Sequence, residues 1–308
     1  MLFKRRRTVA GSTAHRKLLK AQSYIGSRNR EYTVRVPAAS SKDDELPLVM
    51  VIHGCRQDNQ AIENISGFSE LAAKHGFRVV YPFVTSYLGV RDTNCWGWWV
   101  DSEVRRGAGE VEDLWQIIQA VKAEFAVNEK RIHVVGLSAG GGMAVALGVA
   151  QHQNLASIAV VAGVPYGEDA ESVHYMPNMT TRHKRAQEIA DAMLEQIGTP
   201  TRTLPAQIVH SLDDKKVEIQ SACNIRDSWG LCFGVDTQSP VTRQNGKNKG
   251  IEWQHSTYGN GSDASVETLF LRGVGHGWYG GKPGQFSFPD APDVASWNWE
   301  FFRSNPLM

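Results

Sequence analysis

The chain has 308 residues, of which 42% are apolar, 21% are charged and 9% are aromatic, a globular composition with enough apolar residues for one large core. Its formal net charge is +1, but residues 1–30 hold nine Lys or Arg and no acid, so residues 31–308 carry a charge of −8. A mildly acidic body excludes nucleic-acid binding driven by bulk charge.

The sequence contains neither a candidate membrane span nor a secretion signal. No stretch approaches the roughly 18 apolar residues of a membrane-spanning helix, and no apolar run of about 7–15 residues follows the basic N-terminus. We therefore expect a cytoplasmic protein, with secretion as the alternative. Four cysteines are too few for a disulfide scaffold and lack the close pairs of a zinc site, but their even number permits two disulfides in an exported protein: Cys55, Cys95, Cys223 and Cys232.

Residues 1–30 are expected to form a basic, flexible N-terminal arm. No sustained apolar face is present, so at most a short helix is expected, around residues 14–23. One interpretation is a solvated tail. The other is a segment that docks on an anionic surface such as a polymer granule, a membrane or nucleic acid.

Residues 31–308 predict one α/β domain with a mainly parallel, doubly wound sheet. Buried apolar runs typical of strands alternate with helical spacing of apolar residues. Strands are expected over 32–37, 46–54, 77–82, 131–136, 158–165, 206–212 and 266–274, and helices over 67–75, 110–126, 138–150 and 185–197. The strand 32–37 alternates in polarity, as an exposed edge strand does. Residues 166–204 are expected to form an excursion above the sheet.

The segment Gly136-Leu137-Ser138-Ala139-Gly140 lies between a predicted strand and a predicted helix rich in small residues. This is the setting of a nucleophile elbow, in which a tight turn presents a serine hydroxyl at a helix N-terminus. Flanking glycines are needed because a Cβ would collide with the adjoining strand and helix. Ser138 is therefore the predicted catalytic nucleophile.

A serine nucleophile needs a base that is oriented by a carboxylate, in the chain order Ser, acid, His. The predicted strand 206–212 leads into Asp213 and Asp214, and the strand 266–274 leads into His276, which has glycines on both sides. His276 is the predicted base. Asp214 is favoured over Asp213 as the acid because apolar Val217 follows it three residues later.

Backbone N–H groups must also face the oxygen of the substrate carbonyl. One is expected from Ala139, and the second from Cys55 or Arg56 in the loop after the strand that ends at His53-Gly54. His53 is expected to bind loop backbone, and His210 to pack in the core.

Aromatic residues are concentrated in glycine-rich loops near these catalytic positions. We expect Trp96, Trp98, Trp278 and Tyr279 to contribute to a substrate cleft. Neither a metal nor an organic cofactor is needed for this chemistry.

Taken as an ordered set, these motifs resemble the poly(3-hydroxybutyrate) (PHB) depolymerase family of esterases, which is related to the acetyl xylan and feruloyl esterases of carbohydrate esterase family one. The resemblance spans residues 31–303 and is carried by His53-Gly54-Cys55 with Gln57, Cys95-Trp96, Gly136 to Gly141, His210 to Val217, Gly275 to Trp278 with Gly280-Gly281, Trp229-Gly230 and Trp299 to Phe302. It implies an α/β-hydrolase fold with Ser138, Asp214 and His276 as the triad. The family usually has Gly where this chain has Ser211.

The resemblance also implies a substrate. We expect a serine carboxylester hydrolase acting on poly- or oligo(3-hydroxybutyrate) and related short-chain esters. Acetyl xylan or feruloyl esterase activity is the alternative, and a non-catalytic granule-binding protein is an alternative of another class. The absence of a linker and substrate-binding domain favours soluble oligomers, amorphous polymer or small esters. A disulfide between Cys55 and Cys95 near the oxyanion hole is a further hypothesis.

Overall fold

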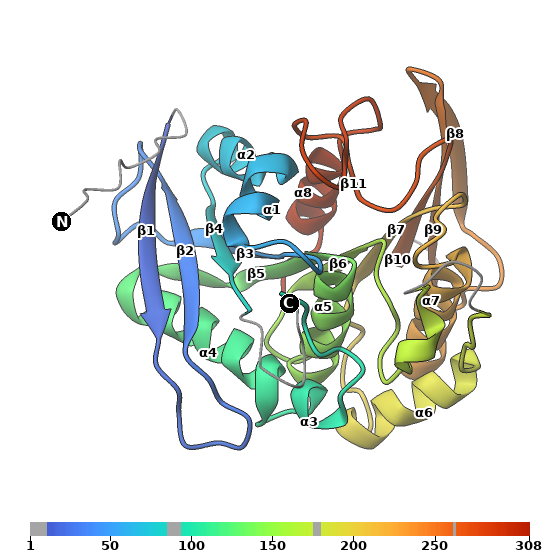
Figure 1. The fold of residues 1–308 in the computed structure, drawn as a ribbon, viewed down its shortest axis with the longest axis horizontal. Coiled ribbons are helices and arrows are strands. Elements are labelled where there is room, and N and C mark those ends of the chain that lie inside the picture. The colour runs from blue at the N-terminus through green and yellow to red at the C-terminus, as the bar shows by residue number, and fades with distance from the viewer. Residues whose placement is uncertain (1–10, 85–93, 175–179, 261–262) are drawn as a thin grey trace.

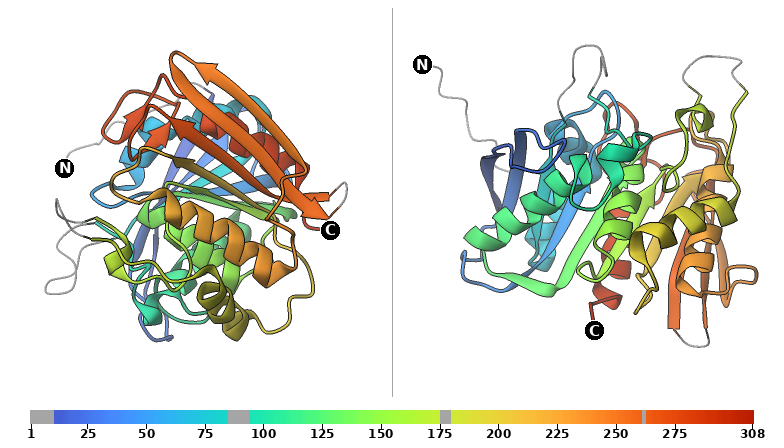
Figure 2. Two further views of the ribbon diagram at one scale, coloured as in Figure 1. Left: turned by 90° about the vertical axis from the view of Figure 1, so that its right-hand side faces the viewer. Right: turned by 90° about the horizontal axis from the view of Figure 1, so that it is seen from below.

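The computed structural model describes residues 11–84, 94–174, 180–260 and 263–308, with the side chains of residues 260, 263 and 264 left aside. A ten-stranded sheet forms the middle layer of the described structure, and helices cover both of its faces (Figures 1 and 2). The strand order is β1-β2-β4-β3-β5-β6-β7-β10-β9-β8.

The centre of the sheet is parallel and its two margins are antiparallel. The parallel strands are β4 (Arg78–Pro82), β3 (Leu46–Ile52), β5 (Val127–Leu137), β6 (Ser157–Val161), β7 (Ala206–Ser211) and β10 (Asp263–Arg272). One margin adds β2 (Arg30–Pro37) and β1 (Ser12–Leu19), and the other adds β9 (Ile251–Asn260) and β8 (Thr242–Asn248). A separate two-stranded pair joins β11 (Trp278–Tyr279) and β12 (Ser287–Phe288). The predicted doubly wound α/β architecture is confirmed.

Two layers of helices cover the sheet. One face carries α1 (Asn59–Ser66), α2 (Phe68–His75) and α8 (Val294–Ser304), which lie above the sheet in Figure 1. The other carries α3 (Asp101–Val104), α4 (Gly109–Glu124), α5 (Ala139–Ala150), α6 (Ala186–Ile197) and α7 (Ile219–Phe233). A short 3-10 helix, η1 (Ala170–Ser172), lies in the excursion between β6 and α6.

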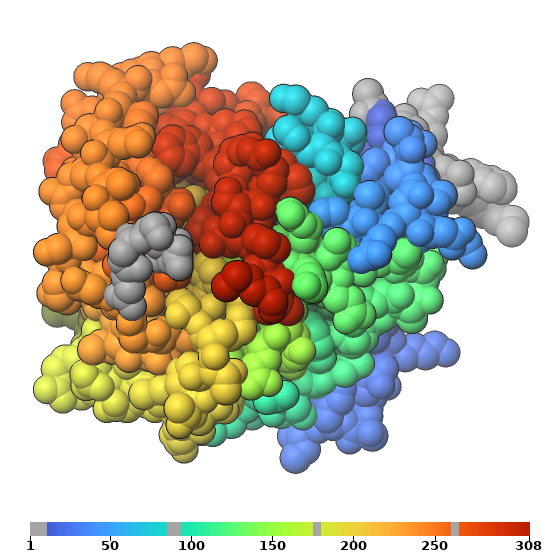
Figure 3. All heavy atoms as spheres, turned by 180° about the vertical axis from the view of Figure 1, so that it is seen from behind, coloured from blue at the N-terminus to red at the C-terminus, as the bar shows by residue number. Residues whose placement is uncertain are grey.

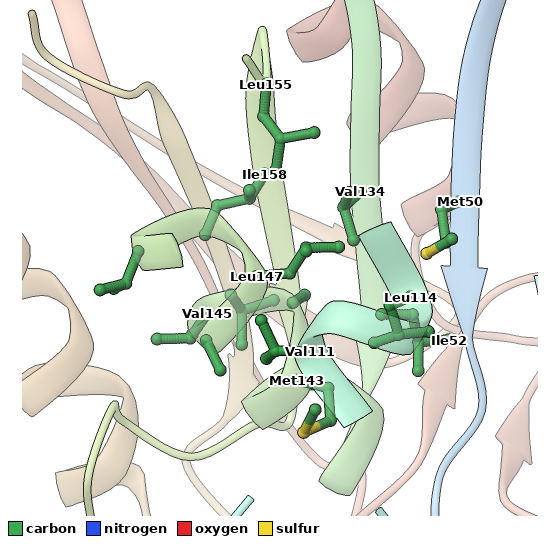
Figure 4. Close-up of a cluster of buried hydrophobic side chains, with 14 of the residues drawn as sticks. Met50, Ile52, Val111, Leu114, Val134, Met143, Val145, Leu147, Leu155 and Ile158 are labelled. Carbon is green, nitrogen blue, oxygen red and sulfur yellow. The ribbon is translucent and has the colours of Figure 1, made fainter. Parts of the chain in front are cut away.

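Each face of the sheet has its own hydrophobic core. The larger core packs α4 and α5 against β3, β5 and β6, and Figure 4 shows part of it: Met50, Ile52, Val111, Leu114, Val134, Met143, Val145, Leu147 and Ile158. The second core lies under α2 and α8. Strands such as β3 and β6 feed side chains into both cores, which explains their unbroken apolar sequences.

The prediction of a flexible arm is wrong for residues 12–30. Ser12–Leu19 form β1, which pairs along its whole length with β2, so the short helix expected around residues 14–23 is also wrong. The positive charges of this segment meet acidic partners: Lys17 Nζ lies 2.7 Å from Glu124 Oε1, and the buried Arg30 Nε lies 2.8 Å from Asp113 Oδ2. Residues 1–10 of the predicted arm lie outside the described residues.

Two further expectations about the sheet margins are wrong or incomplete. Because β1 covers it, β2 is not an edge strand, and seven of its eight residues are buried. On the opposite margin, β8 was not predicted: its sequence TRQNGKN has no apolar residue, and it is exposed along nearly all of its length.

The C-terminal end lies far from the carboxyl end of the central strand. Leu307 N–H donates to Lys130 O near the start of β5 at 2.7 Å, whereas Ser138 follows the end of β5. Seen from behind, the C-terminal residues lie at the surface between the segments drawn in orange and in green (Figure 3). Among the described residues, no helix has the length and apolar character needed to cross a membrane.

Candidate active site

Ser138 lies at the tight turn between β5 and α5 with a φ of 56° and a ψ of −119°. Only close packing of the flanking glycines permits this turn. A Cβ on Gly136 would lie 2.0 Å from the Gly140 carbonyl oxygen, and one on Gly140 would lie 2.3 Å from the Ile52 carbonyl oxygen. The strand–serine–helix turn therefore has the strained backbone of a nucleophile elbow, as predicted.

A chain of hydrogen bonds joins Ser138, His276 and Asp214. Ser138 Oγ lies 2.9 Å from His276 Nε2, and His276 Nδ1 lies 2.7 Å from Asp214 Oδ2. An ionised carboxylate only accepts hydrogen bonds, so Nδ1–H donates to Asp214 and Nε2 is left to accept the Ser138 proton. The three predicted residues thus come together in the arrangement that activates a serine hydroxyl.

Asp214 is buried and held in place by its own loop. Its Oδ1 accepts hydrogen bonds from the N–H groups of Lys216, at 2.8 Å, and Val217, at 3.0 Å. Burial opposes ionisation, but the hydrogen bond and charge of His276 outweigh it and lower the pKa of Asp214. Asp214 is therefore the ionised partner of the histidine at neutral pH.

The other candidates near the acid have structural roles. Asp213 is exposed, and its Oδ2 accepts a hydrogen bond from Gly273 N–H at 2.7 Å, which fixes the loop before His276. The buried His210 donates from Nε2 to Val217 O at 2.8 Å. This agrees with the choice of Asp214 over Asp213 and with the expected core position of His210.

The loop after β3 approaches Ser138 from one side of β5, and the loops that carry Asp214 and His276 approach from the other side. Gly54 N–H donates to Gln57 Oε1 at 2.9 Å, and Arg56 N–H donates to Asn94 O at 2.8 Å. Because the Arg56 N–H already has an acceptor, Cys55 remains the better candidate for the second oxyanion donor beside Ala139, which is the first residue of α5.

The loop after β3 is also tied covalently to a distant segment. Cys55 and Cys95 form a disulfide, as hypothesised, whereas Cys223 and Cys232 on α7 are free. His53 fixes the same loop: its Nε2 accepts from Val84 N–H at 3.2 Å, and its Nδ1–H donates to Gly54 O at 2.8 Å. Burial lowers the pKa of His53 to about 4, so it stays neutral and structural, as expected.

A cavity of about 140 Å³ opens at the triad. Its lining combines the catalytic groups with apolar and basic side chains: Gly54, Cys55, Arg56, Gln57, Leu137, Ser138, Val173, His174, Lys216, Val217, His276 and Phe286. Two larger hollows, of about 580 and 660 Å³, contain no triad residue, and a third, open one of about 520 Å³ contains His276 but not Ser138. The small cavity is therefore the candidate substrate site, and its size suits a short acyl group.

The predicted aromatic lining of the cleft is wrong. Trp96, Trp278 and Tyr279 are fully buried, Trp98 is 4% exposed, and none of the four lines the cavity. Trp278 packs edge-on against Phe68 in the core beneath α2, and Trp96 packs against His53. These rings support the catalytic loops from below.

Sequence reasoning missed the residues that take their place. Val173 and His174 come from the excursion above the sheet, where Val173 forms a bridge with Val217, and Phe286 comes from the loop before β12. The sequence indicates the excursion itself, but contains no signal for which of its side chains turns toward Ser138.

Comparison with known proteins places these findings in a family. Residues 30–235 match the family described as Esterase PHB depolymerase. The chain is 37% identical over 120 residues to poly(3-hydroxyalkanoate) depolymerase C of Paucimonas lemoignei, covering 39% of this chain and 28% of the relative. It is 26% identical over 258 residues to the poly(3-hydroxybutyrate) depolymerase of Ralstonia pickettii, covering 77% and 49%. The chain thus spans half or less of these two depolymerases.

Other similar proteins are carbohydrate esterases. The probable acetylxylan esterase A of Aspergillus clavatus is 24% identical over 241 residues, covering 74% of each chain. The solved acetyl xylan esterase of Aspergillus awamori has a TM-score of 0.70 at 18% identity, covering 94% of this chain and 99% of that one. A ferulic acid esterase from Anaeromyces mucronatus has a TM-score of 0.59 at 12% identity, covering 98% and 93%. Their shared fold is the α/β-hydrolase fold, and the family match over most of its length shows that this chain belongs to the PHB depolymerase esterase family.

Proposed function

We propose that this chain hydrolyses esters of short 3-hydroxyalkanoic acids, above all oligo- or poly(3-hydroxybutyrate), through an acyl-enzyme on Ser138. The observation that carries the proposal is the hydrogen-bonded line from Asp214 through His276 to Ser138, which ends in a small cavity. The family match and the depolymerase relatives support the choice of substrate.

In the first half of the reaction, Ser138 Oγ attacks the ester carbonyl carbon while His276 Nε2 accepts the hydroxyl proton. The negative charge of Asp214 stabilises the imidazolium that forms. The N–H groups of Ala139 and Cys55 hold the oxyanion. When the tetrahedral intermediate collapses, His276 returns the proton to the leaving alcohol oxygen, and the acyl group stays on Ser138.

In the second half, water takes the place of the alcohol. His276 accepts a proton from this water as it attacks the acyl carbonyl, and then returns that proton to Ser138 Oγ as the acid leaves. The apolar side chains of Val173, Val217 and Phe286 line the space beside the acyl group. These apolar side chains favour a short aliphatic acyl group over a polar acyl group that would have to lose bound water.

Acetyl xylan is the second candidate substrate. It is favoured by the acetylxylan esterase relative, which matches 74% of each chain, more evenly than the depolymerases do. An acetyl group is small enough for the cavity, so the leaving alcohol distinguishes the two candidates: a sugar hydroxyl in one case and a hydroxy acid in the other.

The test is a panel of 3-hydroxybutyrate oligomers, amorphous polymer, acetylated xylan and methyl ferulate at equal ester concentration. Ser138→Ala is the blank and is expected to lower kcat by several orders of magnitude, because the acyl-enzyme can no longer form. Faster hydrolysis of the hydroxybutyrate substrates supports the proposal. Faster hydrolysis of acetyl xylan or ferulate would contradict the proposed substrate. Near-normal activity of Ser138→Ala would contradict the proposed mechanism.

A further inference from the structure

Two exposed cations line the cavity from opposite sides. Arg56 belongs to the loop after β3, and Lys216 belongs to the loop after β7. The strands β3 and β7 lie on either side of the β5–β6 pair in the sheet, so the two side chains flank Ser138. Within the part of the chain that the structure describes, no carboxylate lies within 4.0 Å of the Lys216 ammonium. Its charge is therefore available to a ligand.

The position of Lys216 is fixed by the catalytic machinery itself. Its backbone N–H donates to Asp214 Oδ1 at 2.8 Å, and its carbonyl oxygen accepts from His174 N–H at 2.9 Å. The main chain is thus held on both sides while the side chain remains exposed. A substitution of the side chain can remove the charge and leave both backbone hydrogen bonds in place.

The direction of proton transfer decides which part of a substrate meets this lysine. His276 protonates the leaving oxygen, so the leaving alcohol must lie on the His276 side of the cavity. On that side an open cleft shares His276 and Lys216 with the cavity and is also lined by Lys215, Asp213, Gly275 and Phe288. Two lysines face one exposed carboxylate there, and that carboxylate already accepts the Gly273 N–H. The cleft for the leaving group is therefore net positive.

We propose that Lys216 determines specificity by binding a carboxylate on the leaving alcohol. In a 3-hydroxybutyrate oligomer the alcohol released from the last ester bond carries a free carboxylate, separated from the ester oxygen by a short aliphatic spacer. The preferred substrate is accordingly the carboxyl-terminal ester bond of a soluble oligomer. This inference rests on the proposed hydrolysis of 3-hydroxyalkanoate esters.

The test compares the linear 3-hydroxybutyrate dimer with its terminal carboxamide, which has the same shape without the charge. The wild-type chain should have a higher kcat/KM for the acid than for the amide. Lys216→Gln should lower this acid-to-amide ratio about fivefold, mostly through KM, because the ion pair is the same in the ground and transition states. Lys216→Arg should retain the preference. Raising ionic strength from about 0.05 M to about 0.5 M should weaken it in the wild type.

Matched controls distinguish a specific contact of Lys216 with the substrate carboxylate from a general effect of the positive charges around the site. Lys215→Gln removes the same charge from the neighbouring residue, which lines the open cleft but not the triad cavity, and should change the ratio less than twofold. An equal fall in Lys215→Gln, or a fall in Arg56→Gln with none in Lys216→Gln, would overturn the proposal. So would equal hydrolysis of acid and amide by the wild type, even though the proposed esterase function would then stand. Failure to hydrolyse either compound faster than Ser138→Ala would contradict the proposed function itself.

Discussion

The reactivity of Ser138 depends on partners that arrive from three different loops, and each partner occupies a position set by its own backbone. Asp214 illustrates this best. Its Oδ1 accepts two backbone N–H groups and its Oδ2 accepts the His276 N–H, so both carboxylate oxygens are engaged while the side chain is shielded from water. Asp213, its neighbour, points instead to Gly273.

This difference predicts opposite results for two matched substitutions. Asp214→Asn should lower kcat by about four orders of magnitude, because a neutral amide does not stabilise the imidazolium and can select the wrong histidine tautomer. Asp213→Asn keeps an oxygen that can accept the Gly273 N–H and should retain kcat within a factor of about three. The measurement is kcat on a soluble chromogenic butyrate ester. A comparable loss in both variants would contradict the assignment of the acid.

The triad could be predicted from the sequence because each of its members directly follows a strand that is recognisable from its apolar residues. The substrate lining could not. Trp278 and Tyr279 occupy a glycine-rich segment that reads as an open loop, yet both side chains turn into the core beneath α2. The position of a ring relative to a strand end depends on loop packing, such as the contact of Gly277 with the Phe286 carbonyl, and local sequence does not encode that packing.

Among the elements, β1 and the segment that follows it show how charged residues can belong to a fold. Asp113 on α4 is fully buried and accepts hydrogen bonds from Tyr24 Oη at 2.5 Å, Ser27 Oγ at 3.0 Å and Arg30 Nε at 2.8 Å. The carboxylate therefore attaches the whole turn between β1 and β2 to the helix layer. The Arg30 guanidinium is buried with it and also pairs with the buried Glu110 at 3.5 Å, so removing Asp113 leaves a buried positive charge with less compensation.

Asp113→Ala is therefore expected to lower the free energy of unfolding by about 3 kcal/mol, since the buried Arg30 loses the nearer of its two carboxylate partners and Tyr24 and Ser27 lose their acceptor. Glu124→Ala is the control. It breaks the Lys17–Glu124 pair, whose side chains are 31% and 43% exposed, and should cost no more than about 1 kcal/mol. Denaturant unfolding of both variants measures the difference. Similar losses would mean that burial of the Arg30–Asp113 pair does not anchor this segment.

The sequence predicts the central elements better than the marginal ones for a physical reason. A parallel strand buried on both faces must be apolar throughout, so β3 and β6 are visible as unbroken apolar runs. The marginal strand β8 is polar and largely exposed, and β1 is mostly polar and only partly buried; their place in the sheet comes from hydrogen bonds to β9 and β2. Backbone pairing of this kind leaves no periodic apolar signal.

At the scale of the whole molecule, buried histidines connect the fold to pH. Burial lowers the pKa of His53 to about 4, and burial together with Arg131 lowers the pKa of His133 to about 3; burial also lowers the pKa of His210. An unfolded histidine titrates near pH 6.5. Between the two values the unfolded chain binds protons that the folded chain excludes, so the free energy of unfolding must fall as the pH falls below about 6.5.

His133 allows this linkage to be measured away from the active site. It stacks on Phe302 and its Nδ1 lies 2.8 Å from Ser157 Oγ. Replacing both partners, as His133→Phe with Ser157→Ala, removes one buried titrating group. The slope of unfolding free energy against pH between about 6 and 4 should become shallower by about 1.4 kcal/mol per pH unit. Ser157→Ala alone is the control, because it removes the hydrogen bond but keeps the buried histidine and should keep the wild-type slope. An unchanged slope in the double variant would show that His133 also takes up a proton in the folded chain over this range.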